Sequence, residues 1–252
     1  MRNAPIGVLD SGMGGLGVLH ALRRAMPHER FLYFGDNANA PYGPRPLEEI
    51  QALTLRTAHM LMERGVKALV IACNTANSAA GELLKERLPI PVVGVEPDLE
   101  DAHACAGGKR VVVFATQATL ALPLYQGLRK RLCPDAISIP APELVMMVER
   151  GVLSGAEPEA FFREKLRPWP LEEIGAFVMG CTHFIFLHGA LSAVAPGVPI
   201  FDGVTPVIAS LREALAQADA LAASGEGSAE LLTSSDDPEV YARMRVLLAA
   251  EP

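Results

Sequence analysis

The chain has 252 residues, of which half are hydrophobic and a fifth are charged, and its formal net charge is -7. This length suits one large domain or two small ones with a full core, and the acidic balance argues against a nucleic-acid or anionic-membrane partner. No apolar run approaches the roughly 18 residues of a membrane span, and the first residues lack the apolar core of a signal peptide. We therefore expect a cytoplasmic protein with reduced thiols.

Strands and helices alternate through the first half of the chain. Short apolar runs predict strands at 5–10, 30–36, 67–72 and 91–97. Apolar residues at helical spacing predict helices at 16–26, 47–65 and 78–87. Gly65 suits the C-cap of the second of these helices.

The second half repeats this alternation. It predicts strands at 110–115, 136–140, 175–180, 198–202 and 229–235. Helices are predicted at 119–132, 159–166, 205–223 and 237–250. Strands that alternate with helices indicate an α/β fold, in which parallel sheets are covered by helices on both faces.

An internal repeat indicates two domains. ALVIACNT at 68–75 resembles AFVMGCTH at 176–183, and IGVLDSG at 6–12 resembles VVVFATQ at 111–117. We expect two similar parallel-sheet α/β domains related by pseudo-twofold symmetry, with the active site in the cleft between them. The first would comprise 1–97 and 207–252, and the second 98–206. Ligands of such sheets bind beyond the carboxyl ends of the strands, where this reading places Asp10, Cys73, Thr116 and Cys181.

The glycine-rich segment Gly12–Gly17 matches the dinucleotide pattern G-x-G-x-x-G, with Asp36 placed 19 residues after Gly17. Asp10 argues against that interpretation, because its carboxylate would face and repel the pyrophosphate. We expect the glycines to bring backbone close to a small ligand at which Asp10 and Ser11 point. A nucleotide-binding protein remains the alternative from a different functional class.

Two of the four cysteines are candidate catalytic groups. Cys105 and Cys133 are expected to be small buried apolar residues, whereas Cys73 and Cys181 end equivalent strands and precede hydrogen-bonding residues. Two facing thiols suggest that one removes a proton from a carbon and the other delivers a proton to its opposite face. No metal is expected, because the cysteines lack metal-site spacing and no further ligands accompany His183 and His188.

The chain resembles the aspartate/glutamate racemase superfamily, and within it the glutamate racemases. The resemblance lies in IGVLDSGMGGL, YFGDNANAPYGPR, VIACNTA, VVGVEP, ATQAT, LVMMVERG and GCTH, in order from residue 6 to residue 183. It implies racemisation of glutamate without metal or pyridoxal cofactor, to supply D-glutamate for peptidoglycan. It further implies that Cys73 acts on the D-enantiomer, assisted by Asp10. Cys181 would act on the L-enantiomer, assisted by His183 and Glu149. The implied substrate-binding residues are Asp10, Ser11, Tyr42, Gly43, Asn74, Thr75, Thr116, Thr119, Thr182 and His183.

Several positions depart from the family pattern. Asn77 stands where a small or hydroxylated residue is usual, and Phe184–Phe186 follow the GCTH motif in place of Tyr-Pro. Leu122 and the segment 202–204 also differ. His183 favours glutamate, because aspartate racemases more often carry an acidic residue there. A racemase of aspartate or another amino acid is the alternative within the enzyme class, and a binding protein without turnover is another. A homodimer is compatible with the sequence.

Overall fold

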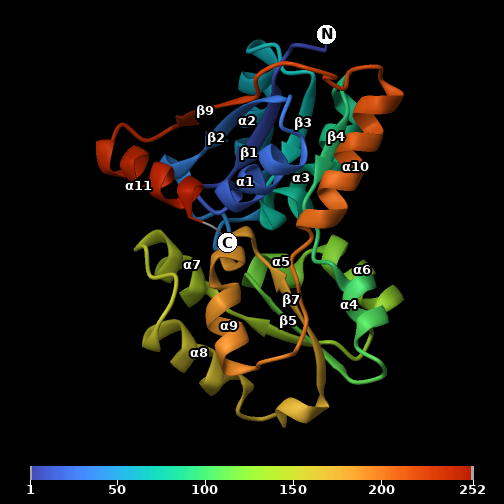
Figure 1. Cartoon of the computed structure of the whole chain (residues 1–252), viewed down its shortest axis with the longest axis vertical. Coiled ribbons are helices and arrows are strands. Elements are labelled where there is room, and N and C mark those ends of the chain that lie inside the picture. The colour runs from blue at the N-terminus through green and yellow to red at the C-terminus, as the bar shows by residue number, and fades with distance from the viewer. Residues whose placement is uncertain (1, 251–252) are drawn as a thin grey trace. The chain divides into compact units, whose positions relative to one another are not determined.

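The computed structural model describes residues 2–250, which form two compact units (Figure 1). The first contains residues 2–95 and 204–250, and the second contains residues 96–203. Each unit is built on one wholly parallel sheet, so the predicted α/β fold with two parallel sheets is confirmed. The domain boundaries, the pseudo-twofold relation and the cleft stay predictions.

The first unit has a five-stranded sheet in the order β4-β3-β1-β2-β9. Its strands are β1 (Ile6–Asp10), β2 (Arg30–Gly35), β3 (Ala68–Ile71), β4 (Val92–Gly94) and β9 (Ser228–Thr233). Two helices, α2 and α3, pack against each other, and α1 packs against α10 and α11 (Figure 1). The helices are α1 (Gly15–Ala25), α2 (Leu47–Glu63), α3 (Asn74–Arg87), α10 (Val204–Gln217) and α11 (Pro238–Ala249), with a short 3-10 helix, η1 (Asn37–Asn39). Residues of β1 and β3 are buried throughout, as expected for the centre of a covered parallel sheet.

The second unit has a four-stranded sheet in the order β6-β5-β7-β8. Its strands are β5 (Arg110–Ala115), β6 (Ile137–Pro140), β7 (Ile174–Gly180) and β8 (Ile200–Phe201). Its helices are α4 (Leu99–Cys105), α5 (Gln117–Ala121), α6 (Pro123–Leu132), α7 (Pro142–Glu149), α8 (Ala156–Leu166) and α9 (His188–Val194), with the 3-10 helices η2 (Leu171–Glu173) and η3 (Thr182–Leu187). Alternate residues of β5 and β7, among them Val111, Val113 and Val178, pack with α4 and α6 in one apolar cluster.

The two sheets share one topology. The order β4-β3-β1-β2 in the first unit matches β8-β7-β5-β6 in the second, strand for strand along the chain. Cys73 follows β3 and Cys181 follows β7, so the two thiols occupy equivalent places in the two sheets. The repeat read from the sequence is therefore present in the connectivity of the strands.

The three largest differences from the predicted helix boundaries each have a local reason. Helix α3 begins at Asn74 instead of 78, because the side chain of Cys73 caps it. The predicted helix 119–132 is two helices, because Pro123 lacks the N–H that a continuous helix needs. Helix α10 ends at Gln217 instead of 223, shortly before Asp219 takes a positive φ of 49°.

A buried ion pair lies at the amino end of the first sheet. Lys67 Nζ lies 2.6 Å from Glu29 Oε2, and both side chains are almost wholly buried. The ammonium also donates to the carbonyl oxygens of Arg2 and Ala220, and Glu29 Oε1 accepts from the N–H of Ala222. These bonds fasten the segment after α10 to the first sheet.

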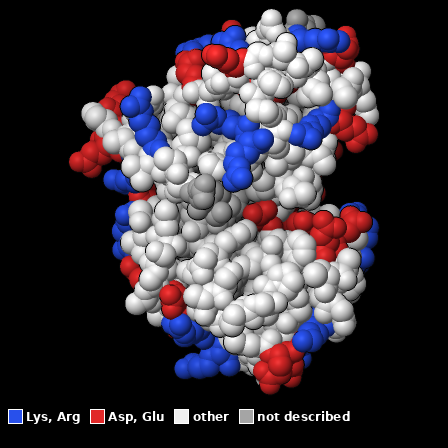
Figure 2. All heavy atoms as spheres, viewed as in Figure 1, with Lys and Arg blue, Asp and Glu red and all other residues white. Residues whose placement is uncertain are grey.

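The visible surface carries charges of both signs. Figure 2 shows groups of Lys and Arg interspersed with groups of Asp and Glu and with broad uncharged areas. Such mixing differs from the one-signed basic surface typical of nucleic-acid-binding proteins. Within residues 2–250, none of the helices is long and apolar enough to cross a membrane.

Candidate functional site

The predicted site residues lie at the carboxyl ends of the parallel strands in both units. The group in the first unit consists of Asp10, Ser11, Tyr42, Gly43, Cys73, Asn74 and Thr75. The group in the second unit consists of Thr116, Thr119, Glu149, Cys181, Thr182 and His183. All except Gly43 and Glu149 are buried polar or thiol side chains, so each needs a hydrogen-bonding partner or a ligand.

Asp10 folds back onto the glycine-rich loop. Its side chain is 1% exposed, and Oδ2 accepts a hydrogen bond of 2.9 Å from the N–H of Gly12. The hydroxyl of Tyr33 lies 3.4 Å from the same oxygen and donates to the carbonyl of Gly12 at 2.9 Å. The cap position of α1 is Gly14, four residues after Asp10. Asp10 therefore does not cap this helix, and its carboxylate occupies an N–H that a bound phosphate would need.

Two glycines of this region serve close packing. A Cβ on Gly15 would lie 2.8 Å from Cβ of Asp10 and 2.9 Å from Cβ of Ala72. A Cβ on Gly35 would lie 2.2 Å from the carbonyl oxygen of Gly12. Any larger residue would force these segments apart. The glycines thus bring the start of α1 and its loop against the ends of β1, β2 and the residues after β3.

Cys73 caps helix α3 with its own sulfur. Its Sγ accepts from the N–H of Ala76 at 3.4 Å and donates to Ser11 Oγ at 3.3 Å. The position at a helix N-terminus favours the thiolate, because N–H groups and the positive end of the helix dipole face the sulfur. Helix α3 thus begins directly behind this thiol and not at the predicted residue 78.

Asp36 and Tyr42 form a buried pair beside the first thiol. The hydroxyl of Tyr42 donates to Asp36 Oδ2 at 2.7 Å, and Asn39 Nδ2 donates to Oδ1 at 2.8 Å. Burial, the bond to Asp36 and the charge of Cys73 raise the pKa of Tyr42, so the phenol stays a neutral donor. Asp36 is held by side chains of its own loop, which leaves it poorly placed to bind a nucleotide ribose.

Asn74 presents an unsatisfied amide. Its side chain is 2% exposed, and neither Nδ2 nor Oδ1 has a hydrogen-bonding partner among residues 2–250. An orphaned buried amide costs roughly 1–3 kcal/mol, which a ligand carrying both acceptor and donor groups would recover. Asn74 and Thr75 open α3 as its first two residues and do not cap it.

Cys181 has a different partner from Cys73. It stands at the cap position of η3, but its sulfur accepts no capping bond there. Instead Nδ1 of His183 lies 3.9 Å from Sγ, and Nε2 of His183 lies 2.7 Å from Oε1 of Glu149. The order thiol, imidazole, carboxylate is typical of an activated nucleophile or base. Glu149 is thus a partner of His183 and not a solvated helix residue.

The charge state of His183 follows from these contacts. Burial lowers the pKa of His183, because it opposes the charged imidazolium. The hydrogen bonds with Cys181 and Glu149 have the larger effect, so the pKa of His183 is raised well above 6.5. A protonated His183 between a carboxylate and a sulfur can hold a thiolate or give it a proton. The two thiols therefore have different polar partners.

The threonines of the second group lie at the starts of α5 and η3. Thr116 caps α5, since its Oγ1 accepts from the N–H of Thr119 at 3.2 Å, and the two hydroxyls lie 3.0 Å apart. Thr182 is buried as the first residue of η3.

His188, Cys105 and Cys133 lie apart from the two groups of site residues. His188 Nε2 lies 3.6 Å from Asp202 Oδ2, and its burial lowers the pKa of His188 although Asp202 raises it. Within residues 2–250, no group of three or more His, Cys, Asp or Glu is arranged to hold a metal ion. Cys133 is buried as expected, but Cys105 is exposed, because it ends the short helix α4 beside a turn.

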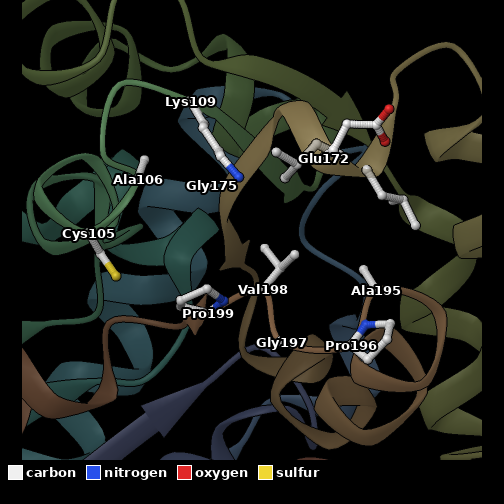
Figure 3. Close-up of a pocket in the computed structure, with 12 residues that line it drawn as sticks. Cys105, Ala106, Lys109, Glu172, Gly175, Ala195, Pro196, Gly197, Val198 and Pro199 are labelled. Atoms are coloured by element: carbon white, nitrogen blue, oxygen red, sulfur yellow. The ribbon is translucent and has the colours of Figure 1, made fainter.

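A cavity of about 580 Å³ lies in the second unit, away from these residues (Figure 3). It is lined by Cys105, Lys109, Glu172 and the segment Ala195–Pro199. These residues precede β5, β7 and β8 and so mark the amino ends of the strands. Because ligands of parallel sheets bind at the opposite, carboxyl ends, this cavity is not the candidate site.

Tyr33 is a site residue that the sequence did not reveal. Its position within the apolar run of β2 is typical of a core aromatic, and only the pairing of Tyr33 with Val8 brings its hydroxyl to the loop after Asp10. The segment YFGDNANAPYGPR at 33–45 contains both Asp36 and Tyr42, so the sequence did single out this loop. The spacing of six residues could not show that they bond to each other.

Comparison with known proteins gives one consistent result. The family model Asp/Glu/Hydantoin racemase matches residues 16–211. The chain is 40% identical to the glutamate racemase of Herpetosiphon aurantiacus over 255 residues, which cover 100% of both chains. Among solved structures it is similar to glutamate racemase from Thermus thermophilus in complex with β-chloro-D-alanine, with a TM-score of 0.86, 39% identity and coverage of 99% and 94%. It is also similar to glutamate racemase from Francisella tularensis in complex with D-glutamate, with a TM-score of 0.85, 28% identity and coverage of 100% and 96%.

Proposed function

The chain belongs to the Asp/Glu/hydantoin racemase family of isomerases, and we propose that it interconverts L- and D-glutamate without a cofactor. The observation that carries the proposal is the retention of two thiols on equivalent strands of a repeated sheet, each with its own polar partners. One thiol serves each face of the substrate α-carbon. The glutamate racemases to which the chain is similar, one of them solved with D-glutamate, support this substrate.

The reaction moves two protons. Cys73, as thiolate, removes the α-proton of D-glutamate, and the electron pair of the broken C–H bond delocalises into the substrate carboxylate. Cys181, as thiol, then gives its proton to the opposite face and becomes the thiolate. The reverse direction begins at Cys181. A free enzyme with the thiol and thiolate exchanged returns to its first state by proton transfer through solvent or through the assisting groups.

The assisting groups differ between the two thiols. His183 and Glu149 support Cys181, because an imidazolium held by a carboxylate can stabilise the thiolate or return its proton. The helix start and Ser11 support Cys73. Asp10 lies beside the Ser11 loop as counter-charge for the substrate ammonium or as proton acceptor for Cys73.

The substrate carboxylate needs donors, because without an electron sink the developing negative charge remains beside it. Asn74 offers an unpartnered buried amide for this purpose. Tyr42, with Gly43 after it, and the hydroxyls of Thr75, Thr116, Thr119 and Thr182 complete the proposed binding set. In a cell, the product D-glutamate would enter peptidoglycan synthesis. Cytoplasmic location and a homodimer are further parts of this proposal.

Racemisation can be tested with single enantiomers. The protein is incubated separately with D-glutamate, L-glutamate, D-aspartate and L-aspartate under reducing conditions, and optical rotation is followed. We expect both glutamate enantiomers to reach a racemic mixture and aspartate to react far more slowly. Faster inversion of aspartate would transfer the proposal to the aspartate racemases. If no amino acid is inverted while both thiols are reduced, the proposed function is wrong.

A further inference from the structure

Asn77 lies in the first turn of α3 and is bonded at both its ends. Its backbone N–H donates to the carbonyl of Cys73 at 2.8 Å, and its side-chain Nδ2 donates to the carbonyl of Val95 at 3.1 Å. The residue is 4% exposed. Unlike the amide of Asn74, the Nδ2 of Asn77 thus already has a partner within the chain.

The contacts of Asn77 close a ring of hydrogen bonds around Cys73. The N–H of Val95 donates to the carbonyl of Ile71 at 3.0 Å, so the end of β4 is fixed to the end of β3. Val95 in turn accepts from Asn77, and Asn77 donates to Cys73. The turn from Ile71 to Asn77 carries the thiol. Its start is bonded to the N–H of Val95, and its end is bonded to the carbonyl of Val95 through the side chain of Asn77.

Two glycines make room for this side chain. A Cβ on Gly94 would lie 1.9 Å from Oδ1 of Asn77, and a Cβ on Gly81 would lie 2.2 Å from the same atom. Neither glycine has a positive φ within the range that disfavours other residues. Glycine is therefore required at these two positions because the side chain of Asn77 fills the space of a Cβ, and not because of the backbone conformation.

We propose that Asn77 is a positioning residue that fixes the first turn of α3, so that the N–H of Ala76 bonds to the sulfur of Cys73. This N–H contact, 3.4 Å long, stabilises negative charge on the sulfur. Loss of the Asn77 side chain frees the turn and weakens the contact. The consequence for catalysis rests on the proposed function, in which Cys73 is an acid/base group, but the consequence for the thiol does not.

The thiol can be measured directly. The wild-type chain and Asn77→Ala are alkylated with iodoacetamide over a range of pH, and the modification of each cysteine is read by mass spectrometry. We expect the alkylation midpoint of Cys73 to rise by about 0.5–1 pH unit, as the loss of one weak hydrogen bond to a charged sulfur implies, while Cys181 keeps its profile. Glu82→Ala is the matched control, because Glu82 is an exposed residue of the same helix and its side chain pairs with Lys85 at the surface.

The glycines give a second, independent test. Gly81→Ala alone should displace Asn77 and raise the Cys73 midpoint, whereas in the Asn77→Ala background it should cause no further rise, because the clashing oxygen is gone. The comparison of Gly81→Ala with the double variant also covers the case in which Asn77→Ala lowers stability. In the double variant, alanine at position 81 has a higher helix propensity than glycine and offsets part of that loss.

An unchanged Cys73 profile in Asn77→Ala would overturn the proposal, as would an equal shift at Cys181 or in Glu82→Ala. Racemisation separates this proposal from the proposed function. A shifted midpoint with about a tenfold fall in kcat supports both. If the Cys73 midpoint shifts in Asn77→Ala but the wild-type chain inverts no amino acid, the role of Asn77 is supported and the proposed function is refuted.

Discussion

The contact between His183 and Glu149 allows a prediction with a defined size. His183 Nε2 and Glu149 Oε1 are 2.7 Å apart, and their side chains are 7% and 20% exposed. Replacement of Glu149 by Gln keeps the size of the side chain and removes its charge. Hydrogen bonds to charged groups contribute roughly 1.5–3 kcal/mol, so we expect a loss of about 2 kcal/mol in the free energy of unfolding.

The loss should depend on pH in one direction. The folded-state pKa of His183 is raised above 6.5, so the folded protein holds this proton more tightly than the unfolded chain does. The stability that results is fully present below about pH 6.5 and is lost as the pH rises through the folded-state pKa. The difference between wild type and Glu149→Gln should therefore be largest near pH 6 and shrink as the pH rises.

Activity should fall with stability. In the proposed mechanism, the bond from Glu149 also stabilises the imidazolium of His183 in the transition state. A loss of about 2 kcal/mol of that stabilisation corresponds to a fall of about 30-fold in kcat/KM. Because the equilibrium constant of a racemase is one, the fall must be equal in both directions. Chemical denaturation at several pH values and polarimetry with each enantiomer measure the two effects.

Glu157→Gln is the matched control. Glu157 pairs with Arg150, and both side chains are about half exposed, so the pair contributes little. We expect this variant to match wild type in activity and to differ in stability by less than about 1 kcal/mol. If Glu149→Gln behaves like Glu157→Gln at pH 6, the reasoning about the buried carboxylate is refuted.

The remaining predictions concern both units. Lys67→Met leaves Glu29 charged and buried and should lower the free energy of unfolding by about 3–5 kcal/mol; a urea midpoint close to wild type would contradict this. Tyr33→Phe removes the one hydroxyl that donates to the carbonyl of Gly12 and lies beside Asp10 Oδ2. It should lower the free energy of unfolding by about 1–3 kcal/mol, with a fall in kcat measured by polarimetry. An unchanged kcat would show that Tyr33 does not position Asp10. Because Asp10 occupies the N–H of Gly12, NAD at millimolar concentration should leave the melting temperature unchanged, and a clear rise would revive the nucleotide alternative.

Much of the site could be predicted because it follows from a repeat. Cys73 and Cys181 end strands with the same neighbours, and a repeated apolar run with a thiol behind it is visible in the sequence. Residues after parallel strands gather at one edge of a sheet, so the grouping of Asp10 with Cys73, and of Thr116 with Cys181, also follows from the strand pattern.

The unpredicted parts depend on contacts between distant segments. Tyr33 became a partner of the loop after Asp10 through strand register. Asn77 could be seen as a departure from the family pattern, but its bond to Val95 and the fit against Gly94 depend on the packing of α3 on β4. The helices α4, α7 and α9 were missed, since each is 7–8 residues long and too short to show a helical period.

The central claim is that two thiols act on opposite faces of one carbon. Its most direct test is the isotope content of substrate and product during the first few per cent of reaction in heavy water. Our account predicts that the product carries deuterium at the α-carbon from the start while the remaining substrate does not, in both directions. It further predicts that Cys73→Ala and Cys181→Ala each abolish inversion. Product that retains the original α-hydrogen, or inversion at the normal rate with either thiol removed, would contradict the two-thiol mechanism.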